Sequence, residues 1–314
     1  MSKIAVDIRN HKGTDSSQQL VEAFPQWLDQ APLCRDIERL CDPGEDISEN
    51  ALLNLSAKYF FSFLYPGAQT NPVPPFEIGQ RLRMFTRCRS LNEPGDDIET
   101  MNLMRRFAVA LSLAGEPEVA ARVLRALLAQ RLEIGSGRFL GLDIYAGAGL
   151  LTLGQYVLAR RSGYSQVEAW GIEEDSQCAE RAGALLRSLG AGNVAFADPS
   201  AGEAYKVVGG RNVCLVTTSA TAGVCASLCD RRFFGAYAAL FNACGPALDR
   251  ASFFPEGLIA FSREANVSLI LSRENGFQRP PEFEGSDLQP QGWIVGGNVL
   301  PLHRLAGESR SILG

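Results

Sequence analysis

Small residues and acids stand at the spacing of a nucleotide site between positions 139 and 198. An apolar run of strand length at 139–144 is followed by the bend Ala146-Gly147-Ala148-Gly149, which has no bulky side chain in four positions. Glycine adopts backbone angles that other residues resist and lets a ligand approach the main chain closely. A second strand candidate, 167–172, ends in Glu173 and Glu174. Because nucleotide-binding α/β folds use an acid at such a strand end to hold ribose hydroxyls, this pattern favours a nucleoside ligand.

The residue at position 152 indicates whether the nucleoside ligand carries a pyrophosphate. The dinucleotide fingerprint places a third glycine where the helix packs against the strand, and that position here is Thr152. Pyrophosphate binding is therefore disfavoured, and with only two histidines in the chain an NAD-linked oxidoreductase is weakened further. S-adenosylmethionine has a ribose, an adenine and an amino-acid tail but no phosphate, so it fits the pattern better.

The segment Asp143-Ile144-Tyr145-Ala146-Gly147-Ala148-Gly149 resembles motif I of the class I S-adenosylmethionine-dependent methyltransferases. That superfamily usually carries an acid followed by three glycines at alternate positions, and Tyr145 stands where the first glycine would be. A tyrosine there is also met in RNA methyltransferases with an Asp-Leu-Tyr-Cys-Gly type of turn. The resemblance covers about residues 135–262.

This resemblance implies roles for several residues. Gly147 and Gly149 would line the methionine part of the cofactor, and Glu173 would accept from both ribose hydroxyls. Asp198 matches the acid that lies near the adenine amino group. The full set expected to contact S-adenosylmethionine is Asp143, Tyr145, Ala146, Gly147, Gly149, Glu173, Glu174, Asp198 and Thr217.

Three of these residues have alternative roles. A buried acid such as Glu173 is costly unless something donates to it, which ribose hydroxyls would do; a cap for the following helix suits Asp175 or Ser176 better than Glu173. The ring of Tyr145 either borders the cofactor or packs within the strand. Thr217 and the two polar residues after it either bond an acceptor or the methionine tail, or cap the following helix.

The elements that must position these residues follow an α/β pattern. We expect a Rossmann-like, doubly wound, mostly parallel sheet with antiparallel closing strands, preceded by an all-α N-terminal domain. The helical domain is predicted over residues 1–134, as a lid or substrate platform, and the S-adenosylmethionine-binding domain over 135–314. The predicted parallel strands are 139–144, 167–172, 193–197, 212–216 and 257–262, the helices are 150–161, 176–189 and 222–244, and the antiparallel pair is 267–272 with 293–302.

Helical spacing of apolar residues runs through most of residues 16–131. Ser48 is predicted to cap one of these helices, and two others are predicted over 98–113 and 116–131. The aromatic run 59–65 is either the wall of a substrate pocket or helix core, since aromatic residues at helical spacing usually pack against one another.

Net charge and cysteine spacing limit the function classes. The net charge of −5 argues against a whole-surface attraction to nucleic acid, and no apolar run approaches the ~20 residues needed to cross a bilayer. Since the chain also opens without a signal-peptide pattern, we expect a cytoplasmic location. The eight cysteines form no Cys-x-x-Cys pair, so no metal site is expected. The expected partner is a small-molecule substrate, with neither nucleic acid nor membrane involved and a homodimer as one option for assembly.

The chemistry of methyl transfer explains why no catalytic residue is assigned. Transfer from a sulfonium needs the acceptor held in line with the methyl group, and a base only where the acceptor still carries its proton. The end of the fourth strand, 217–220, lacks the Asn/Asp-Pro-Pro-Tyr motif of many amino-group methyltransferases and the Asp-Pro-Pro-Arg motif usual in RNA uridine methyltransferases. The preferred prediction is an S-adenosylmethionine-dependent methyltransferase acting on a small molecule.

Two other functions stay open. A helical N-terminal portion followed by Gly147-Ala148-Gly149 and an apolar helix to Leu158-Ala159 resembles the layout of nicotianamine synthase-like enzymes. That resemblance implies transfer of the aminocarboxypropyl group from the same cofactor, which leaves methylthioadenosine instead of S-adenosylhomocysteine. The third function is a non-catalytic binding or scaffold protein that keeps the fold, because no acceptor motif is recognised.

Overall fold

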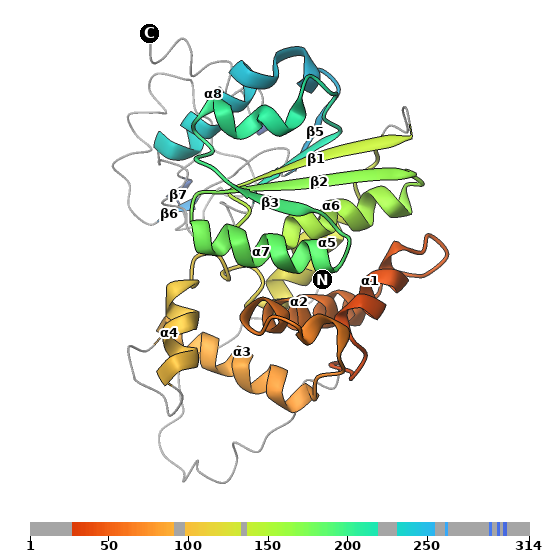
Figure 1. Cartoon of the computed structure of the whole chain (residues 1–314), viewed down its shortest axis with the longest axis vertical. Coiled ribbons are helices and arrows are strands. Elements are labelled where there is room, and N and C mark those ends of the chain that lie inside the picture. The colour runs from red at the N-terminus through yellow and green to blue at the C-terminus, as the bar shows by residue number, and fades with distance from the viewer. Residues whose placement is uncertain are drawn as a thin grey trace.

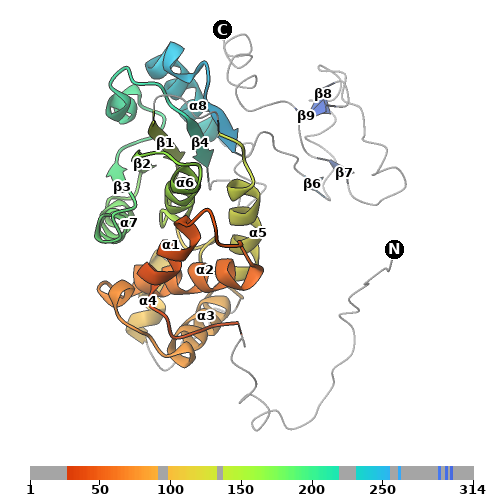
Figure 2. The same ribbon diagram turned by 90° about the vertical axis from the view of Figure 1, so that its right-hand side faces the viewer.

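The computed structural model describes residues 27–90, 98–132, 137–218 and 231–254, with four two-residue strands beyond them at 261–262, 289–290, 294–295 and 298–299. A five-stranded parallel sheet lies between helix α8 on one face and helices α6 and α7 on the other (Figure 1). The N-terminal helices form further layers on the α6 and α7 side. Figure 2 shows α5 beside α6, with α1 and α2 next to them.

The elements described between residues 33 and 128 are helices, and their boundaries follow local signals. Ser48 accepts a hydrogen bond from the backbone N–H of Ala51, which confirms the predicted cap, and Pro117 opens α5 at a position where its missing N–H is not needed. The elements are α1 (Leu33–Cys41), α2 (Glu49–Leu64), the 3-10 turn η2 (Ala68–Thr70), α3 (Pro75–Ser90), α4 (Ile98–Arg106) and α5 (Pro117–Leu128).

The helix predicted over 98–113 ends early. Helix α4 stops at Arg106, and residues 107–115 form consecutive turns. Within them the carbonyl of Ala110 accepts from the N–H of Ala148, far along the chain, in place of an amide of its own segment. This tertiary hydrogen bond involves one carbonyl of a segment that otherwise keeps local bonds, such as that from the N–H of Leu111 to the carbonyl of Phe107, and helical apolar spacing cannot reveal it.

The sheet has the strand order β3-β2-β1-β4-β5, with every neighbouring pair parallel. Sequential strands first run outward to β3, and the order then reverses between β1 and β4, which makes their carboxyl ends a topological switch point. The strands are β1 (Arg138–Ile144), β2 (Gln166–Glu173), β3 (Asn193–Phe196), β4 (Leu215–Thr218) and β5 (Ser252–Phe254), and the helical elements between them are α6 (Leu150–Arg161), α7 (Ser176–Ser188), η3 (Gly202–Val208), α8 (Arg231–Cys244) and η5 (Gly245–Leu248).

The C-terminal strand predictions need correction where they fall on described residues. The fourth strand is 215–218 and not 212–216, because Thr217 and Thr218 continue the ladder beside β1. The fifth is 252–254, whereas most of the predicted 257–262 lies outside the described residues. Most of the predicted antiparallel pair also lies outside them. Two short antiparallel pairs are described, β6 (Phe261–Ser262) with β7 (Gln289–Pro290) and β8 (Ile294–Val295) with β9 (Asn298–Val299), each as a separate two-stranded sheet.

One hydrophobic core joins the N-terminal helices to the sheet. It contains α2 side chains such as Phe60 and Phe63, α5 side chains such as Leu124, and Leu153 of α6. The aromatic run of α2 is therefore helix core, with Phe60 packed edge-on against Phe85 at 5.3 Å between ring centroids. Among the described residues, no helix has the combination of length and apolar character that a membrane crossing requires.

Candidate functional site

The bend after β1 has an unusual backbone. Tyr145 has a φ of +55°, and it is the one residue other than glycine with positive φ in the described part of the chain. Gly147 and Gly149 follow with φ of +54° and +82°. The left-handed conformation thus occurs at alternate positions, as the three-glycine pattern would require, with tyrosine at the first of them. A non-glycine residue held there costs about 1–3 kcal/mol, so surrounding contacts must enforce it.

Glu173 lies at the end of β2 and points toward the bend. Its Oε2 accepts from the backbone N–H of Gly147 at 2.8 Å, and its Oε1 accepts from the N–H of Asp175 at 3.0 Å. Burial raises the pKa of Glu173 although both oxygens accept these bonds. Asp175, one of the two residues predicted for this cap, caps α7 and accepts from the N–H groups of Gln177 and Cys178. The two amides that donate to Glu173 are partners that the sequence did not reveal.

The N-terminal helices cover one side of the bend. The N–H of Ala148 donates to the carbonyl of Ala110 at 3.2 Å, and the hydroxyl of Tyr59 donates to the carbonyl of Ala148 at 2.6 Å. A Cβ atom on Gly147 would lie 3.0 Å from the Ala110 oxygen, and one on Gly149 would lie 3.0 Å from the Tyr59 oxygen. Both glycines therefore have close neighbours within the protein, and a ligand has no approach from this side.

A buried polar network lies beneath the bend. Asp143 is fully buried, and its carboxylate accepts from the hydroxyls of Thr152 at 2.9 Å and Thr217 at 2.8 Å. Gln155 in turn donates to the Thr217 hydroxyl and to the carbonyl of Leu142. Burial raises the pKa of Asp143 to about 6 despite these two donors. Thr217 is consequently a strand residue whose hydroxyl takes part in this network.

A third fingerprint glycine, at position 152, would allow helix α6 to pack closely against the strand. In this chain the glycine that allows the close packing lies on the strand instead. A Cβ atom on Gly171 of β2 would lie 3.0 Å from the Thr152 hydroxyl oxygen and 2.7 Å from the Cβ of Ala146. The missing side chain at Gly171 leaves room for Thr152 on α6. The signal was present in the sequence as a glycine inside an apolar strand.

The remaining predicted residues lie at the carboxyl edge of the sheet. Glu174 and Asp198 are exposed at the ends of β2 and β3. Hydrogen bonds from the N–H and hydroxyl of Ser200 lower the pKa of Asp198. Phe196 pairs with Glu173 in the ladder and is 65 % exposed, an aromatic side chain at this edge that sequence reasoning missed.

The predicted residues outside the bend 146–149 therefore separate into two groups. Tyr145, Glu173, Glu174 and Asp198 share the carboxyl edge, whereas Asp143 and Thr217 lie beneath the bend in the buried network. The continuation of β4 at 219–230 lies outside the described residues. In the part of the chain that the structure describes, no three His, Cys, Asp or Glu side chains converge to hold a metal ion. The chain has no match among models of protein families, curated proteins or solved structures.

Proposed function

We propose that the protein binds S-adenosylmethionine at the carboxyl ends of β1, β2 and β4 and transfers its methyl group to a small-molecule acceptor. The observation that carries the proposal is the left-handed backbone of Tyr145 at the switch point. Open α/β sheets bind ligands at such a point, and strained backbone persists chiefly where function requires it. The proposal includes a Rossmann-like fold closed by antiparallel strands and an all-α N-terminal domain to residue 134.

The residues at this edge fit the adenosyl part of the cofactor. Each oxygen of Glu173 accepts one backbone N–H, and a carboxylate oxygen has a second lone pair that a ribose hydroxyl can use. Asp198 is exposed and negatively charged, as a partner for the adenine amino group must be. Because Ala110 covers the opposite side, the nucleoside would enter beside Tyr145. The cofactor would supply an activated methyl group, and the chain would hold it in line with the acceptor.

A non-catalytic protein that keeps the fold is the second candidate, and the covered bend favours it. Ala110 and Tyr59 account for the absence of side chains at Gly147 and Gly149 without any ligand. Two backbone N–H groups likewise donate to the buried carboxylate of Glu173, so it has hydrogen-bond donors without a ligand. Under this candidate the bend is a docking surface for the protein's own N-terminal helices.

Calorimetric titration with S-adenosylhomocysteine tests the proposal, with NADH as the comparison ligand for a dinucleotide site. S-adenosylhomocysteine should bind at one site and raise the melting temperature, because a ligand selective for the folded state stabilises it. Asp198→Asn keeps the acceptor oxygen for Ser200 but removes the charge, and it should weaken binding about tenfold. Asp249→Asn, an exposed change beyond α8, is the matched control. Absence of binding by the folded protein would leave the second candidate.

Product analysis then separates the two transfer reactions. A methyltransferase converts S-adenosylmethionine to S-adenosylhomocysteine, and an aminocarboxypropyl transferase converts it to methylthioadenosine. Detection of methylthioadenosine in a turnover that depends on the acceptor would replace methyl transfer by the alternative reaction at the same site.

A further inference from the structure

The bend after β1 and the N-terminus of α6 are the two places where a nucleotide-binding α/β fold holds an anionic group of its ligand. The bend offers main-chain N–H groups, and the helix offers the positive end of its dipole. A phosphate or a carboxylate bound there needs N–H groups that have no other acceptor. In this chain both places are already occupied by groups of the protein itself.

Every N–H group of the bend 146–149 donates to an acceptor within the protein. The acceptors are three main-chain carbonyls and one carboxylate, which for residues 146 to 149 in chain order are the oxygen of Ile172 at 3.0 Å, Oε2 of Glu173 at 2.8 Å, the oxygen of Ala110 at 3.2 Å and the oxygen of Ala146 at 2.8 Å. Because a main-chain N–H carries a single proton, none of these four is left for an anionic group of a ligand.

The N-terminus of α6 already has a carboxylate beside it. Asp143 of β1 accepts from the hydroxyl of Thr152 at 2.9 Å and also from its backbone N–H, in the first turn of α6. A negative charge at this position offsets the positive end of the helix dipole. Since Asp143 is fully buried, an anionic group of a ligand cannot replace it without unfolding the network beneath the bend.

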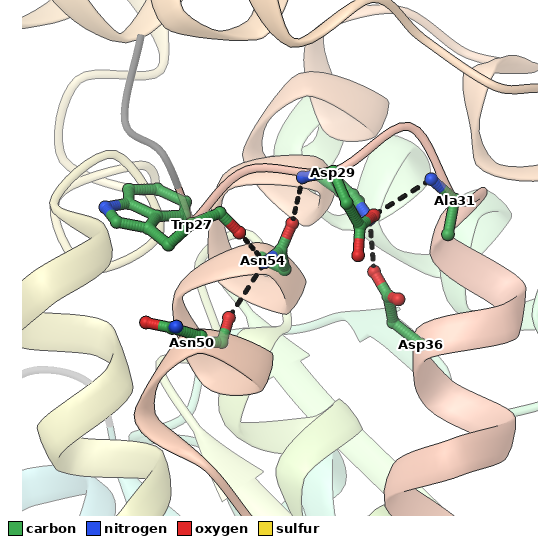
Figure 3. Close-up of polar contacts among 7 residues, drawn as sticks. Trp27, Asp29, Ala31, Asp36, Asn50 and Asn54 are labelled. Atoms are coloured by element: carbon green, nitrogen blue, oxygen red, sulfur yellow. Dashed lines mark hydrogen bonds and ion pairs between the residues drawn. The ribbon is translucent and has the colours of Figure 1, made fainter. Parts of the chain in front are cut away.

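Helix α2, which covers the bend, is anchored by polar side chains. Figure 3 shows Asn54 of α2 accepting from the N–H of Asp29, and one turn later Lys58 donates to Asp36 of α1. Arg161 at the end of α6 in turn donates to main-chain carbonyls at the C-terminal end of α1. Because α6 begins directly after the bend, these contacts hold α2 in place over it, and a charged tail cannot displace α2 without breaking them.

The open side of the bend is bordered by carboxylates. Glu173 and Glu174 stand at the end of β2, and Asp198 follows β3 at the same edge of the sheet. Their charges repel an anion that approaches this edge and attract a cation such as the sulfonium of the proposed cofactor. The charge of the edge therefore favours the same class of ligand as the occupied bend does.

We propose that this edge selects adenosine compounds whose substituent on the ribose is neutral or cationic, and that the bend does not hold the amino-acid tail of S-adenosylmethionine. The inference rests on the proposed function, because it concerns the same nucleoside site. The recognised parts are the ribose, at Glu173, and the adenine, at Asp198. The methionine part then lies away from Gly147 and Gly149, in contrast to what the resemblance to motif I implies.

Calorimetric titration of the full chain with S-adenosylhomocysteine, methylthioadenosine and adenosine monophosphate tests the inference. Methylthioadenosine has the nucleoside without the tail, so it should bind within about threefold of S-adenosylhomocysteine and compete with it for one site. Adenosine monophosphate carries a phosphate instead and should bind at least about tenfold more weakly. A carboxylate held by the protein contributes about tenfold or more to affinity. Methylthioadenosine weaker than S-adenosylhomocysteine by that factor would overturn the inference and leave the proposed function standing.

Asp198→Asn shows whether the two ligands share the nucleoside contacts. It should weaken S-adenosylhomocysteine and methylthioadenosine by the same factor, and the exposed change Asp249→Asn should alter neither. A loss for S-adenosylhomocysteine alone would overturn the inference. Binding of methylthioadenosine without binding of S-adenosylhomocysteine would support the inference and reject the proposed cofactor. If the folded protein binds neither compound, both the inference and the proposed function are rejected.

Discussion

The contact between the bend and residue 110 can be tested by adding one methyl group. Gly147→Ala places a Cβ atom 3.0 Å from the carbonyl oxygen and 3.2 Å from the Cα of Ala110. Both neighbours are main-chain atoms, so no flexible side chain can move aside. Gly190→Ala is the matched control, because Gly190 has a similar φ of +63° and nothing lies within 4 Å of its would-be Cβ.

The two substitutions share one cost and differ in another. Alanine in the left-handed conformation costs about 1–2 kcal/mol, partly offset by about 0.4–1 kcal/mol from the reduced freedom of the unfolded chain. Gly190→Ala should therefore destabilise by about 1 kcal/mol. Gly147→Ala adds the cost of overpacking, about 1–3 kcal/mol. The difference in free energy of unfolding between the two variants should be about 2 kcal/mol.

Urea denaturation followed by circular dichroism measures this difference. With an m value of about 2 kcal/mol/M, the midpoint of Gly147→Ala should lie about 1 M below that of Gly190→Ala. Equal midpoints would refute the reasoning, because the bend would then not be covered by residue 110. In that case both sides of the bend would be open to a ligand, and the case for a non-catalytic protein would lose its main support.

Three further predictions concern buried polar groups. The pKa of Asp143 is about 6 in the folded state against an ordinary 3.8, so the folded state binds the carboxyl proton of Asp143 more tightly than the unfolded state does. The contribution of this proton to stability is therefore full below pH 3.8 and is lost as pH rises through 6. Asp143→Asn should remove this dependence, and denaturation between pH 4 and 7 should show a change of about 2 kcal/mol in the wild-type minus variant stability. Lys58→Met leaves the buried carboxylate of Asp36 uncompensated and should cost about 3–5 kcal/mol, with Asp36→Asn restoring part of it in a double-mutant cycle; no restoration would contradict the ion pair. Tyr59→Phe removes a buried hydrogen bond to the bend and should cost about 1 kcal/mol by urea denaturation, against little change for Tyr156→Phe on the half-buried surface of α6; equal losses would speak against that bond.

The sequence predicted the elements whose signals are local. The apolar run before the bend became β1, and the helix predicted over 150–161 has those bounds, because its apolar spacing and the following glycine are both readable. The cap at Ser48 and the cap at Asp175 were read from residue type alone. The direction of Glu173, toward the bend, followed from its place at the end of β2.

The features that sequence could not predict depend on long-range contacts. A backbone carbonyl such as that of Ala110 has no signature in the sequence, so the covering of the bend and the early end of α4 were both missed. The hydrogen bond from the Thr217 hydroxyl to Asp143, 74 positions away in the chain, was likewise not predicted. Such pairings exist only once the strands are adjacent, and hydropathy patterns carry no information about them.

The most direct test is a crystal structure of the protein grown with saturating S-adenosylhomocysteine. The proposal predicts density for the nucleoside at the carboxyl ends of β1 and β2, beside Tyr145, with its ribose hydroxyls on Glu173 and with Ala110 still over Gly147. An edge without a nucleoside at saturating ligand, in a structure that keeps the covered bend, would contradict S-adenosylmethionine binding and leave a protein that retains the fold without the cofactor.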